Sequence, residues 1–374
     1  MHLALVLDRF DPDRGGLEHW AWQWTQWLLA RGHAVSVVAA AVRADLQRPG
    51  LALYALGEAD SRLALGARVA ACLADLRVDL VHDLGVGWRY DLLQPQFGSR
   101  LVNDRQQLRA LSGWQRLRAR ASRHRRRRLA DLRALERRQY VAQRGHVVAV
   151  SEMTKRDLCS AHGLAAERVT VIHNGVDAAR FAAPQPAVRQ RLRQRGGWAD
   201  QVVLLFAAHN FPLKGLETVL RALARLRTPR LHLLVTGRGP VAAYAARATQ
   251  LGIAGQVTFA GVVPDVREAF AVADAFVQPT FYDPCSLVLL EAAASGLPLL
   301  TSRRNGAAEL FRDGASAWIV ADPADAGETA RRLETFLDAA TRARMGAAAH
   351  AVAQRATADA AFATLFALCE ARRG

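Results

Sequence analysis

Short runs of apolar residues recur along the chain, and segments with helical spacing separate them. In the first half they include VDLVHD at 78–83 and GHVVAV at 145–150, and a second series begins with VVLLFAAH at 202–209. Strands that are apolar from end to end, with helices between them, are typical of parallel sheets covered on both faces. The pattern therefore predicts an α/β protein with two doubly wound sheets, and a length of 374 residues favours two domains.

A segment rich in Pro, Gln and Arg, residues 182–200, separates the two series. We therefore expect a first domain over residues 1–180 and a second over residues 181–351, followed by a last helix within residues 352–374. Ligands of parallel sheets bind beyond the carboxyl ends of the strands, and with two domains the expected site is the cleft between them.

Two strand-end loops contain residues suited to binding an anion. Gly15 and Gly16 follow the first strand and open a helix, where the backbone can approach a negative group. Lys214 precedes a helix after the first strand of the second series, where its ammonium can meet a phosphate. The alternatives are a simple tight turn for the glycine pair and a solvated surface side chain for the lysine.

A third loop and its helix, YDPCSLVLLEAAASG at 282–296, contain two carboxylates. Asp283 lies in a Pro-containing turn, and Glu291 lies eight positions later in a stretch with helical spacing. Glu291 is the only charged residue of this helix, and a carboxylate in such surroundings usually needs a partner. The two carboxylates are therefore candidate site residues.

Together these segments resemble retaining glycosyltransferases of family 4, including those of the lipopolysaccharide core, which have the GT-B fold. Residues 274–306 are similar to the family's acidic-seven-acidic motif and its EA-x-A-x-G-x-P stretch. The early glycine loop, VIHNGVDAARF at 171–181 and the G-x-G-P at 237–240 support the resemblance. It implies two Rossmann-like domains facing a central cleft. Residues 1–180 would bind the acceptor, with the helix of 352–374 packing back on them, and residues 181–351 would bind the nucleotide-sugar donor.

The resemblance implies a donor site on the helix that follows Asp283. The first free N–H groups of that helix, at 286–288, would hold the nucleotide diphosphate at the positive end of the helix dipole. Glu291 would accept hydrogen bonds from the ribose hydroxyls, and Asp283 from hydroxyls of the transferred sugar. The expected catalytic residues are Lys214 and Asp283. The expected donor-binding residues are Gly15, Gly16, Lys214, Asp283, Ser286, Leu287, Val288 and Glu291.

The resemblance also implies a mechanism. Lys214 would offset the charge that grows on the leaving diphosphate. Because relatives retain the anomeric configuration, attack and departure are expected on one face of the sugar, where the leaving phosphate can take the acceptor's proton. We therefore expect no dedicated general base. No metal site is expected, since Lys214 and the helix N–H groups can take over its role, and no cofactor beyond the donor substrate, a UDP-, GDP- or ADP-sugar.

The chain departs from the family pattern in two places. The first acidic residue of the motif is usually Glu and is Asp283 here, which leaves the identity of the sugar open. Relatives generally carry an Arg shortly before the lysine, and AAHNFPLKG has none; Arg180, or the pair at 303–304, is a candidate replacement. We further assign Asp83 and Gln96 as candidate acceptor contacts, although Asp83 could equally cap a loop.

The positive charge of the chain is concentrated in one segment. Residues 116–138 contain eleven Arg against one Asp and one Glu, a net charge of +9 within a total of +16. If residues 114–140 form one helix, its arginines share a face with i, i+3, i+4 spacing, beside apolar residues. This pattern favours an anionic membrane surface as partner, bound through Arg123, Arg125, Arg126, Arg127 and Arg128. A solvated arm is the alternative; nucleic acid is not expected, because few aromatic residues lie nearby.

Several protein classes are excluded. No run of about 18 apolar residues occurs, so a spanning helix is not expected, and the start MHLALVLDRF lacks the basic lead of a signal peptide. The four cysteines form no C-x-x-C pair, which fits a reducing cytosol. We expect a cytoplasmic protein, peripheral on the inner face of the inner membrane, that moves a hexose or heptose to a lipid-linked or phosphorylated glycan acceptor. The alternatives are a transferase with a soluble acceptor, a sugar-nucleotide epimerase or phosphorylase of similar fold, and a non-enzymatic polyanion-binding protein.

Overall fold

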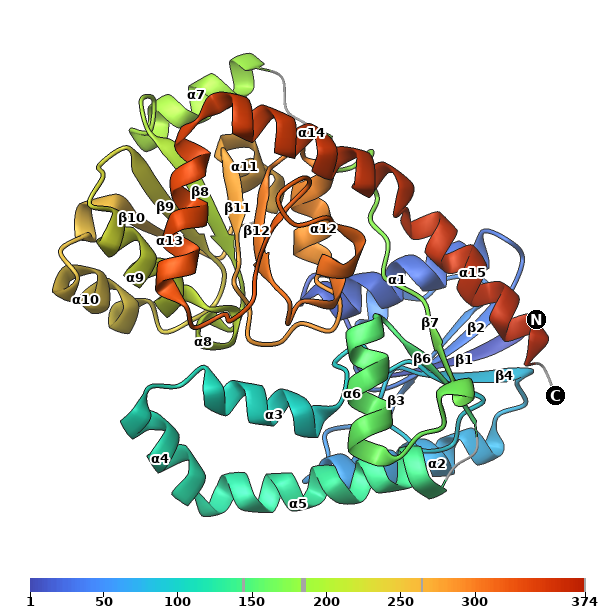
Figure 1. The fold of residues 1–374 in the computed structure, drawn as a ribbon. Helices are drawn as coiled ribbons and strands as arrows, with labels where there is room; N and C mark the ends of the chain where they lie inside the picture. The colour runs from blue at the N-terminus through green and yellow to red at the C-terminus, as the bar shows by residue number, and fades with distance from the viewer. Residues whose placement is uncertain (143–144, 183–185, 264, 373–374) are drawn as a thin grey trace. The chain divides into compact units, whose positions relative to one another are not determined.

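The chain divides into two compact units, each built on its own parallel sheet (Figure 1). The computed structural model describes residues 1–142, 145–182, 186–263 and 265–372. Unit 1 contains Met1–Arg105, Ser112–His173 and Asp359–Gly374, and unit 2 contains Gln106–Leu111 and Asn174–Ala358.

Unit 1 has a seven-stranded sheet in the order β3-β2-β1-β4-β5-β6-β7. The strands are β1 (His2–Phe10), β2 (Ala34–Val42), β3 (Leu51–Ala55), β4 (Leu80–Asp83), β5 (Leu92–Leu93), β6 (His146–Ala149) and β7 (Val169–Val171). All pairings are parallel, with Leu3 opposite both Val35 and Leu80. The strand order reverses its direction at β1, so the carboxyl ends of β1 and β4 flank the position where sheets of this kind bind ligands.

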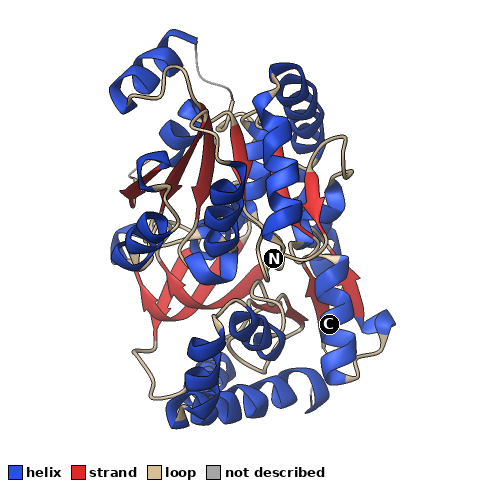
Figure 2. Cartoon of the chain, turned by 60° about the vertical axis from the view of Figure 1, so that its left-hand side comes forward, coloured by secondary structure: helices blue, strands red, loops and turns tan. Residues whose placement is uncertain are grey.

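Helices cover the sheet of unit 1 on both faces (Figure 2). They are α1 (Gly16–Leu29), α2 (Arg62–Asp75), α3 (Arg100–Arg109), α4 (Gly113–Ala121), α5 (Arg123–Arg137), α6 (Glu152–His162) and α15 (Ala358–Ala371). The last of these, α15, packs on α1 through aromatic rings. The Phe362 ring lies 5.6 Å from that of Trp20 and 5.3 Å from that of Trp24 between centroids, and the Trp27 indole donates to Asp359 at 2.6 Å.

Unit 2 has a six-stranded sheet in the order β10-β9-β8-β11-β12-β13. The strands are β8 (Val202–Ala207), β9 (Leu231–Thr236), β10 (Val257–Gly261), β11 (Ala275–Val277), β12 (Leu299–Ser302) and β13 (Trp318–Val320). Its helices are α7 (Pro186–Gly196), α8 (Phe211–Lys214), α9 (Leu216–Leu226), α10 (Val241–Gln250), α11 (Val266–Val272), α12 (Leu287–Ala294), α13 (Ala326–Glu334) and α14 (Ala339–Arg355). Strands β8 and β9 are buried along their whole length, because helices cover both faces of the sheet.

These two sheets confirm the predicted fold class, two doubly wound domains. The division of the chain differs in detail from the prediction, because the first long segment of unit 1 ends at His173 and not at residue 180. Residues 106–111 also group with unit 2. Of the predicted linker, residues 183–185 lie outside the described residues, and α7 occupies most of the remainder.

The predicted last helix, residues 352–374, is in fact parts of two helices. Residues up to 355 belong to α14 in unit 2, and α15 begins at Ala358. The break occurs because the chain leaves the helix to pair with Val176, whose N–H donates to Ala356 and whose carbonyl accepts from Ala358. The two segments approach so closely that a Cβ on Gly175 would lie 2.1 Å from the Thr357 carbonyl oxygen. Residues 373–374 lie outside the described residues.

The predicted single helix over 114–140 is also wrong, because α4 and α5 are separate helices. Ser122 leaves the helical conformation, with ψ at 119°, and its hydroxyl accepts from the Arg125 N–H to cap α5. The two helices therefore present their side chains independently. In the part of the chain that the structure describes, no helix is long and apolar enough to cross a bilayer.

Candidate functional site

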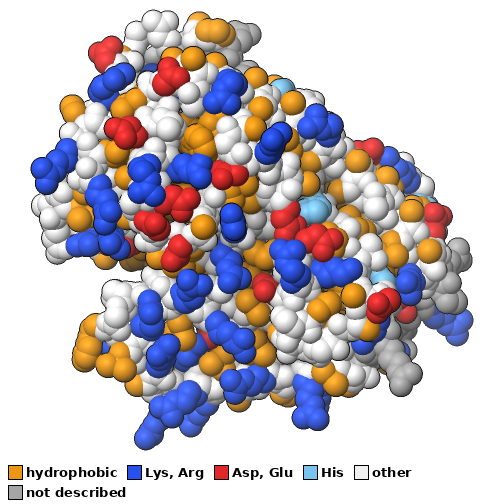
Figure 3. Space-filling view, in the orientation of Figure 1, with side chains coloured by type: hydrophobic (Ala, Val, Ile, Leu, Met, Phe, Trp, Pro, Cys, Tyr) orange, Lys and Arg blue, Asp and Glu red, His pale blue; other side chains and the backbone are white. Residues whose placement is uncertain are grey.

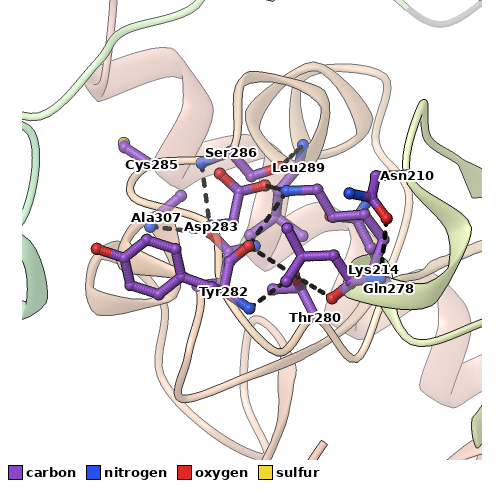
Figure 4. Close-up of polar contacts among 12 residues, drawn as sticks. Asn210, Lys214, Gln278, Thr280, Tyr282, Asp283, Cys285, Ser286, Leu289 and Ala307 are labelled. Carbon is purple, nitrogen blue, oxygen red and sulfur yellow. Dashed lines mark hydrogen bonds and ion pairs between the residues drawn. The ribbon is translucent and has the colours of Figure 1, made fainter. Parts of the chain in front are cut away.

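The strand ends of unit 2 bring Lys214 and Asp283 into contact (Figure 4). Lys214 ends α8, the short helix after β8, and Asp283 lies in the turn after β11. The Lys214 Nζ lies 2.5 Å from the Asp283 Oδ2 and 3.5 Å from the Tyr282 carbonyl oxygen. Both side chains are mostly buried, at 20% and 13% exposure, so water screens the pair only partly. The two predicted catalytic residues therefore form one charged pair.

The backbone around this pair is held in place by close packing. Asn210 caps α8 by accepting the Leu213 N–H at 3.2 Å, and the Phe281 N–H donates to the Leu213 carbonyl at 2.8 Å. Gly215 ends α8 with φ at +84°, and a Cβ there would lie 2.1 Å from the Pro279 carbonyl oxygen. Only glycine satisfies both conditions, so it allows the Lys214 turn to lie directly against the segment that leads to Asp283.

The helix α12 begins beside this pair, and its first turn differs from the prediction in one respect. Ser286 is the N-cap, and its hydroxyl accepts from the Leu289 N–H at 3.4 Å. The Ser286 N–H, which we expected to be free, donates to the Asn305 side chain at 3.3 Å. The N–H groups of Leu287 and Val288 have no acceptor within the helix and remain suited to an anion.

Asn305 is a residue of this site that sequence analysis missed. Its side-chain oxygen accepts from the N–H groups of Ser286 and Ala307, and its amide donates to Thr301 at 3.0 Å. It is buried, and it ties the loop after β12 to the start of α12. The signal in the sequence was the dipeptide Asn305-Gly306, a typical turn pattern.

Glu291 lies in the second turn of α12, where burial raises the pKa of its carboxyl to about 7. The positive charge of Arg180 acts in the opposite direction and lowers this pKa. Among the residues that the structure describes, no side chain makes a hydrogen bond or ion pair with the Glu291 carboxyl. A partly buried carboxyl without such a contact is available to a ligand. The pKa of Asp265 is lowered mainly by the hydrogen bonds from Arg267, and the charge of Arg180 adds to this effect.

The predicted residues of unit 1 lie at the carboxyl ends of its strands. Gly15 is the N-cap of α1, and the carboxylate of Glu18 lies at the same end of this helix, with a pKa raised mainly by burial. Asp83 is fully buried, and its two oxygens accept the N–H groups of residues 85–87 at 2.6–2.7 Å. Asp83 thus anchors the turn after β4. Gln96 is half-buried in the loop after β5.

Two of the five arginines predicted to bind a membrane form ion pairs with an aspartate of the protein. The buried carboxylate of Asp104, on α3, binds the guanidinium groups of both Arg125 and Arg128. Arg125 is only 18% exposed, whereas Arg123, Arg126, Arg127 and Arg128 are exposed. Arg125 and Arg128 therefore have an acidic partner within the protein, and membrane binding by the five arginines stays a prediction.

Two family models match the chain in succession. The model described as "Glycosyltransferase Family 4" matches residues 14–180, and the one described as "Glycosyl transferases group 1" matches residues 188–352. Each therefore corresponds to one predicted domain.

Curated relatives match parts of the chain. The GDP-mannose-dependent alpha-(1-6)-phosphatidylinositol monomannoside mannosyltransferase of Mycolicibacterium smegmatis is 34% identical over 186 residues, 46% of this chain and 48% of the relative. The lipopolysaccharide core biosynthesis glycosyltransferase LpsE of Rhizobium meliloti is 34% identical over 154 residues, 41% of this chain and 44% of the relative. The chain spans about half the length of the curated relatives it matches.

Similarity to a solved structure extends over nearly the whole chain. The crystal structure of WaaG, a glycosyltransferase involved in lipopolysaccharide biosynthesis, superposes with a TM-score of 0.79 over 97% of this chain and 98% of WaaG. The sequences are 21% identical, a level at which the likeness concerns the fold alone.

Proposed function

The chain belongs to glycosyltransferase family 4 and has the GT-B fold, and from this premise we propose that it transfers a hexose or heptose from a nucleoside diphosphate sugar to a lipid-linked glycan acceptor. The observation that carries this proposal is the arrangement of Lys214, Asp283 and Glu291 around the start of α12. In unit 2 a lysine, the N–H groups of a helix terminus and two carboxylates meet at the carboxyl edge of one sheet.

Each residue of the proposed site suits one part of the donor. The diphosphate lies at the N–H groups of Leu287 and Val288, where the helix dipole and Lys214 favour negative charge. Glu291, further along the same helix, accepts hydrogen bonds from the ribose hydroxyls. Asp283 accepts from hydroxyls of the sugar, on the other side of the phosphates. Gly15 and Gly16, at the start of α1, stay predicted donor contacts.

The reaction proceeds with retention and without a metal. As the glycosidic bond breaks, negative charge grows on the diphosphate, and Lys214 stabilises that charge. The acceptor hydroxyl attacks the face from which the diphosphate departs, and the departing phosphate oxygen takes the hydroxyl proton. No general base of the protein is needed in this scheme. Acceptor contacts by Asp83, Gln96 and Arg180 remain part of the proposal.

The acceptor is proposed to lie at a membrane. Both curated relatives are named for glycolipid acceptors or lipopolysaccharide, which supports a lipid-linked acceptor here. In Figure 3, Lys and Arg side chains gather over the region that α4 and α5 form. On α4, Trp114 and Leu117 are 73% and 60% exposed and share one face at i, i+3 spacing. Exposed apolar side chains beside arginines match the surface of an anionic bilayer. The proposed location is the cytoplasmic face of the inner membrane.

The experiment that tests the transferase is donor hydrolysis. The purified protein is incubated with UDP-, GDP- and ADP-sugars, and slow release of the sugar without acceptor is followed for the wild type and for Lys214→Ala. Hydrolysis of one donor, lost in the variant, supports a transferase. A protein that converts one nucleotide sugar into another is an epimerase, and one that binds none of them has another function.

A further inference from the structure

A short turn of unit 2 carries an arginine beside the segment that leads to Lys214. Residues 237–240 connect β9 to α10, and β9 is the direct neighbour of β8, which leads to Lys214. Because the strands are parallel, the two loops leave the sheet at the same edge.

The two loops are in close contact. Gly237 has φ at +112°, and a Cβ on it would lie 1.8 Å from the Ala208 carbonyl oxygen. A Cβ on Gly239 would lie 2.3 Å from the ring of Phe211, the first residue of α8. The turn that carries Arg238 is therefore seated on the segment that ends at Lys214.

A hydrogen bond fixes the backbone of Arg238 in this turn. Its N–H donates to the Nδ1 of His209 at 3.3 Å, which leaves the proton of the neutral imidazole on Nε2. Burial, and secondly the charge of Arg238, lower the pKa of His209. The Arg238 side chain is exposed, and within the described ranges its guanidinium makes no ion pair or hydrogen bond.

The charge balance at the diphosphate requires such a cation. A nucleoside diphosphate sugar is a dianion, and its diphosphate becomes more negative as the glycosidic bond breaks. Lys214 is already paired with Asp283 at 2.5 Å, so much of its charge is compensated within the protein. We propose that Arg238 is a further donor-binding residue, whose guanidinium contacts the diphosphate beside Lys214; this inference rests on the proposed function.

The rival cations are Arg303 and Arg304, which follow β12. Strand β11 separates β12 from β8, whereas β9 adjoins β8 directly. The Arg304 carbonyl accepts the Asp283 N–H at 2.9 Å, so this residue belongs to the side of the site where the sugar is proposed to lie. Arg238 is therefore the arginine of the three whose loop adjoins the Lys214 loop, and the Arg304→Ala variant decides between the two sides.

The test compares Arg238→Ala and Arg238→Lys with two further variants by calorimetry. Arg221→Ala removes the same charge from an exposed position in the middle of α9 and serves as the matched control. Arg304→Ala tests the rival. The ligands are UDP, GDP and ADP, together with uridine, guanosine and adenosine, which have the base and ribose without phosphate.

We expect Arg238→Ala to weaken binding of the preferred diphosphate at least about tenfold, the effect of losing a hydrogen bond to a charged group. Binding of the matching nucleoside should be unchanged, and Arg238→Lys should recover part of the loss. Wild-type affinity in Arg238→Ala, an equal loss of nucleoside and diphosphate, or a loss in Arg304→Ala alone would each overturn the inference and leave the proposed function standing. A wild-type protein that binds none of the three diphosphates would overturn both.

Discussion

The ammonium of Lys214 and the carboxylate of Asp283 face each other at 2.5 Å. Each thus holds the other in place, and a bound diphosphate sugar has to share the lysine with the aspartate. Lys214 is one of only two lysines in a chain with a net charge of +16, which otherwise uses arginine as its cation. A compact ammonium fits this position, whereas the planar guanidinium fork has different geometric requirements.

Replacing the members of this pair should separate turnover from binding. We expect Lys214→Ala to lower kcat by about 10²-fold or more, because its charge matters most as the diphosphate departs. Asp283→Asn should impair use of the sugar while bare UDP or GDP binds as well as before, since the variant releases Lys214. Calorimetry with the free diphosphate and steady-state kinetics measure the two effects. If Asp283→Asn abolishes binding of the bare diphosphate, the proposed orientation of the donor is reversed.

Glu291→Gln should weaken nucleotide binding by about 1.5–3 kcal/mol, the range for hydrogen bonds to a charged group. Because the pKa of Glu291 is raised to about 7, the carboxylate that accepts from the ribose is populated mainly above that pH. Wild-type affinity should therefore rise between pH 6 and pH 8, and this rise should be absent from the variant. Nucleotide affinity is measured by titration of both proteins at the two pH values. Identical pH profiles would argue against contact of Glu291 with the ribose.

The same substitution should change stability in a pH-dependent direction. The raised pKa means that between about pH 4.5 and pH 7 the folded protein keeps a proton that the unfolded chain has released. The free energy of unfolding of the wild type therefore falls as pH rises through this window and levels off above it. The free energy of unfolding of Glu291→Gln, measured without ligand and relative to the wild type, should increase by about 1 kcal/mol or more from pH 5 to pH 8. One pKa unit corresponds to about 1.4 kcal/mol. Thermal unfolding at both pH values measures this gain, which a constant difference would contradict.

Membrane binding should depend on the exposed arginines of α4 and α5. We expect replacement of Arg118, Arg120, Arg123, Arg126 and Arg127 by Ser to remove binding to anionic vesicles, since each contributes about 1 kcal/mol near such a surface. Wild-type binding should fall steeply with salt, because the screening length is about 8 Å at physiological ionic strength. Donor hydrolysis should survive in the variant. Vesicle sedimentation at several salt concentrations is the measurement.

Two control variants sharpen this experiment. Arg125→Ser leaves the buried Asp104 with one fewer partner and should lower stability without lowering vesicle binding of the folded protein. Replacing both Trp114 and Leu117 by Ser keeps the charge, and should weaken binding at high salt most. Unchanged sedimentation of the five-Ser variant would place the membrane contact elsewhere on the protein.

Phe362→Ala should destabilise unit 1 by about 3–5 kcal/mol, the usual cost of removing a buried phenyl ring. Phe362 is 4% exposed and packs on Trp20 and Trp24. Urea unfolding followed by tryptophan fluorescence reports on this contact directly, with Phe97→Ala, an exposed phenylalanine, as the matched control. Equal midpoints for the two variants would show that α15 contributes little to unit 1.

The sequence predicted the two sheets because their strands are apolar from end to end. It also indicated which residues lie at the carboxyl edge of the second sheet, because parallel strand ends share an edge. The sequence did not predict contacts between side chains that are distant in the chain. Nothing in the Arg-rich segment reveals that Asp104, on the preceding helix, holds Arg125 and Arg128. Likewise, spacing predicted the start of α12, but not that the Asn305 side chain takes the Ser286 N–H.

The helix breaks at Ser122 and Thr357 escaped prediction for a related reason. Neither position has the Pro or Gly that usually ends a helix. At Thr357 the helix ends because Val176, 181 residues earlier, takes the backbone of residues 356–358 as its hydrogen-bonding partner. A pattern of local propensities contains no information about such a pairing.

The position of α15 has a consequence during synthesis on the ribosome. The earlier segments of unit 1 have emerged by His173, but its last helix follows only after the whole of Asn174–Ala358. At about 5–20 residues per second, this leaves the tryptophan face of α1 uncovered for roughly 10–40 s. The nascent N-terminal unit therefore exposes an aromatic surface to chaperones and to neighbouring chains, and it is completed only after the unit translated later has left the exit tunnel.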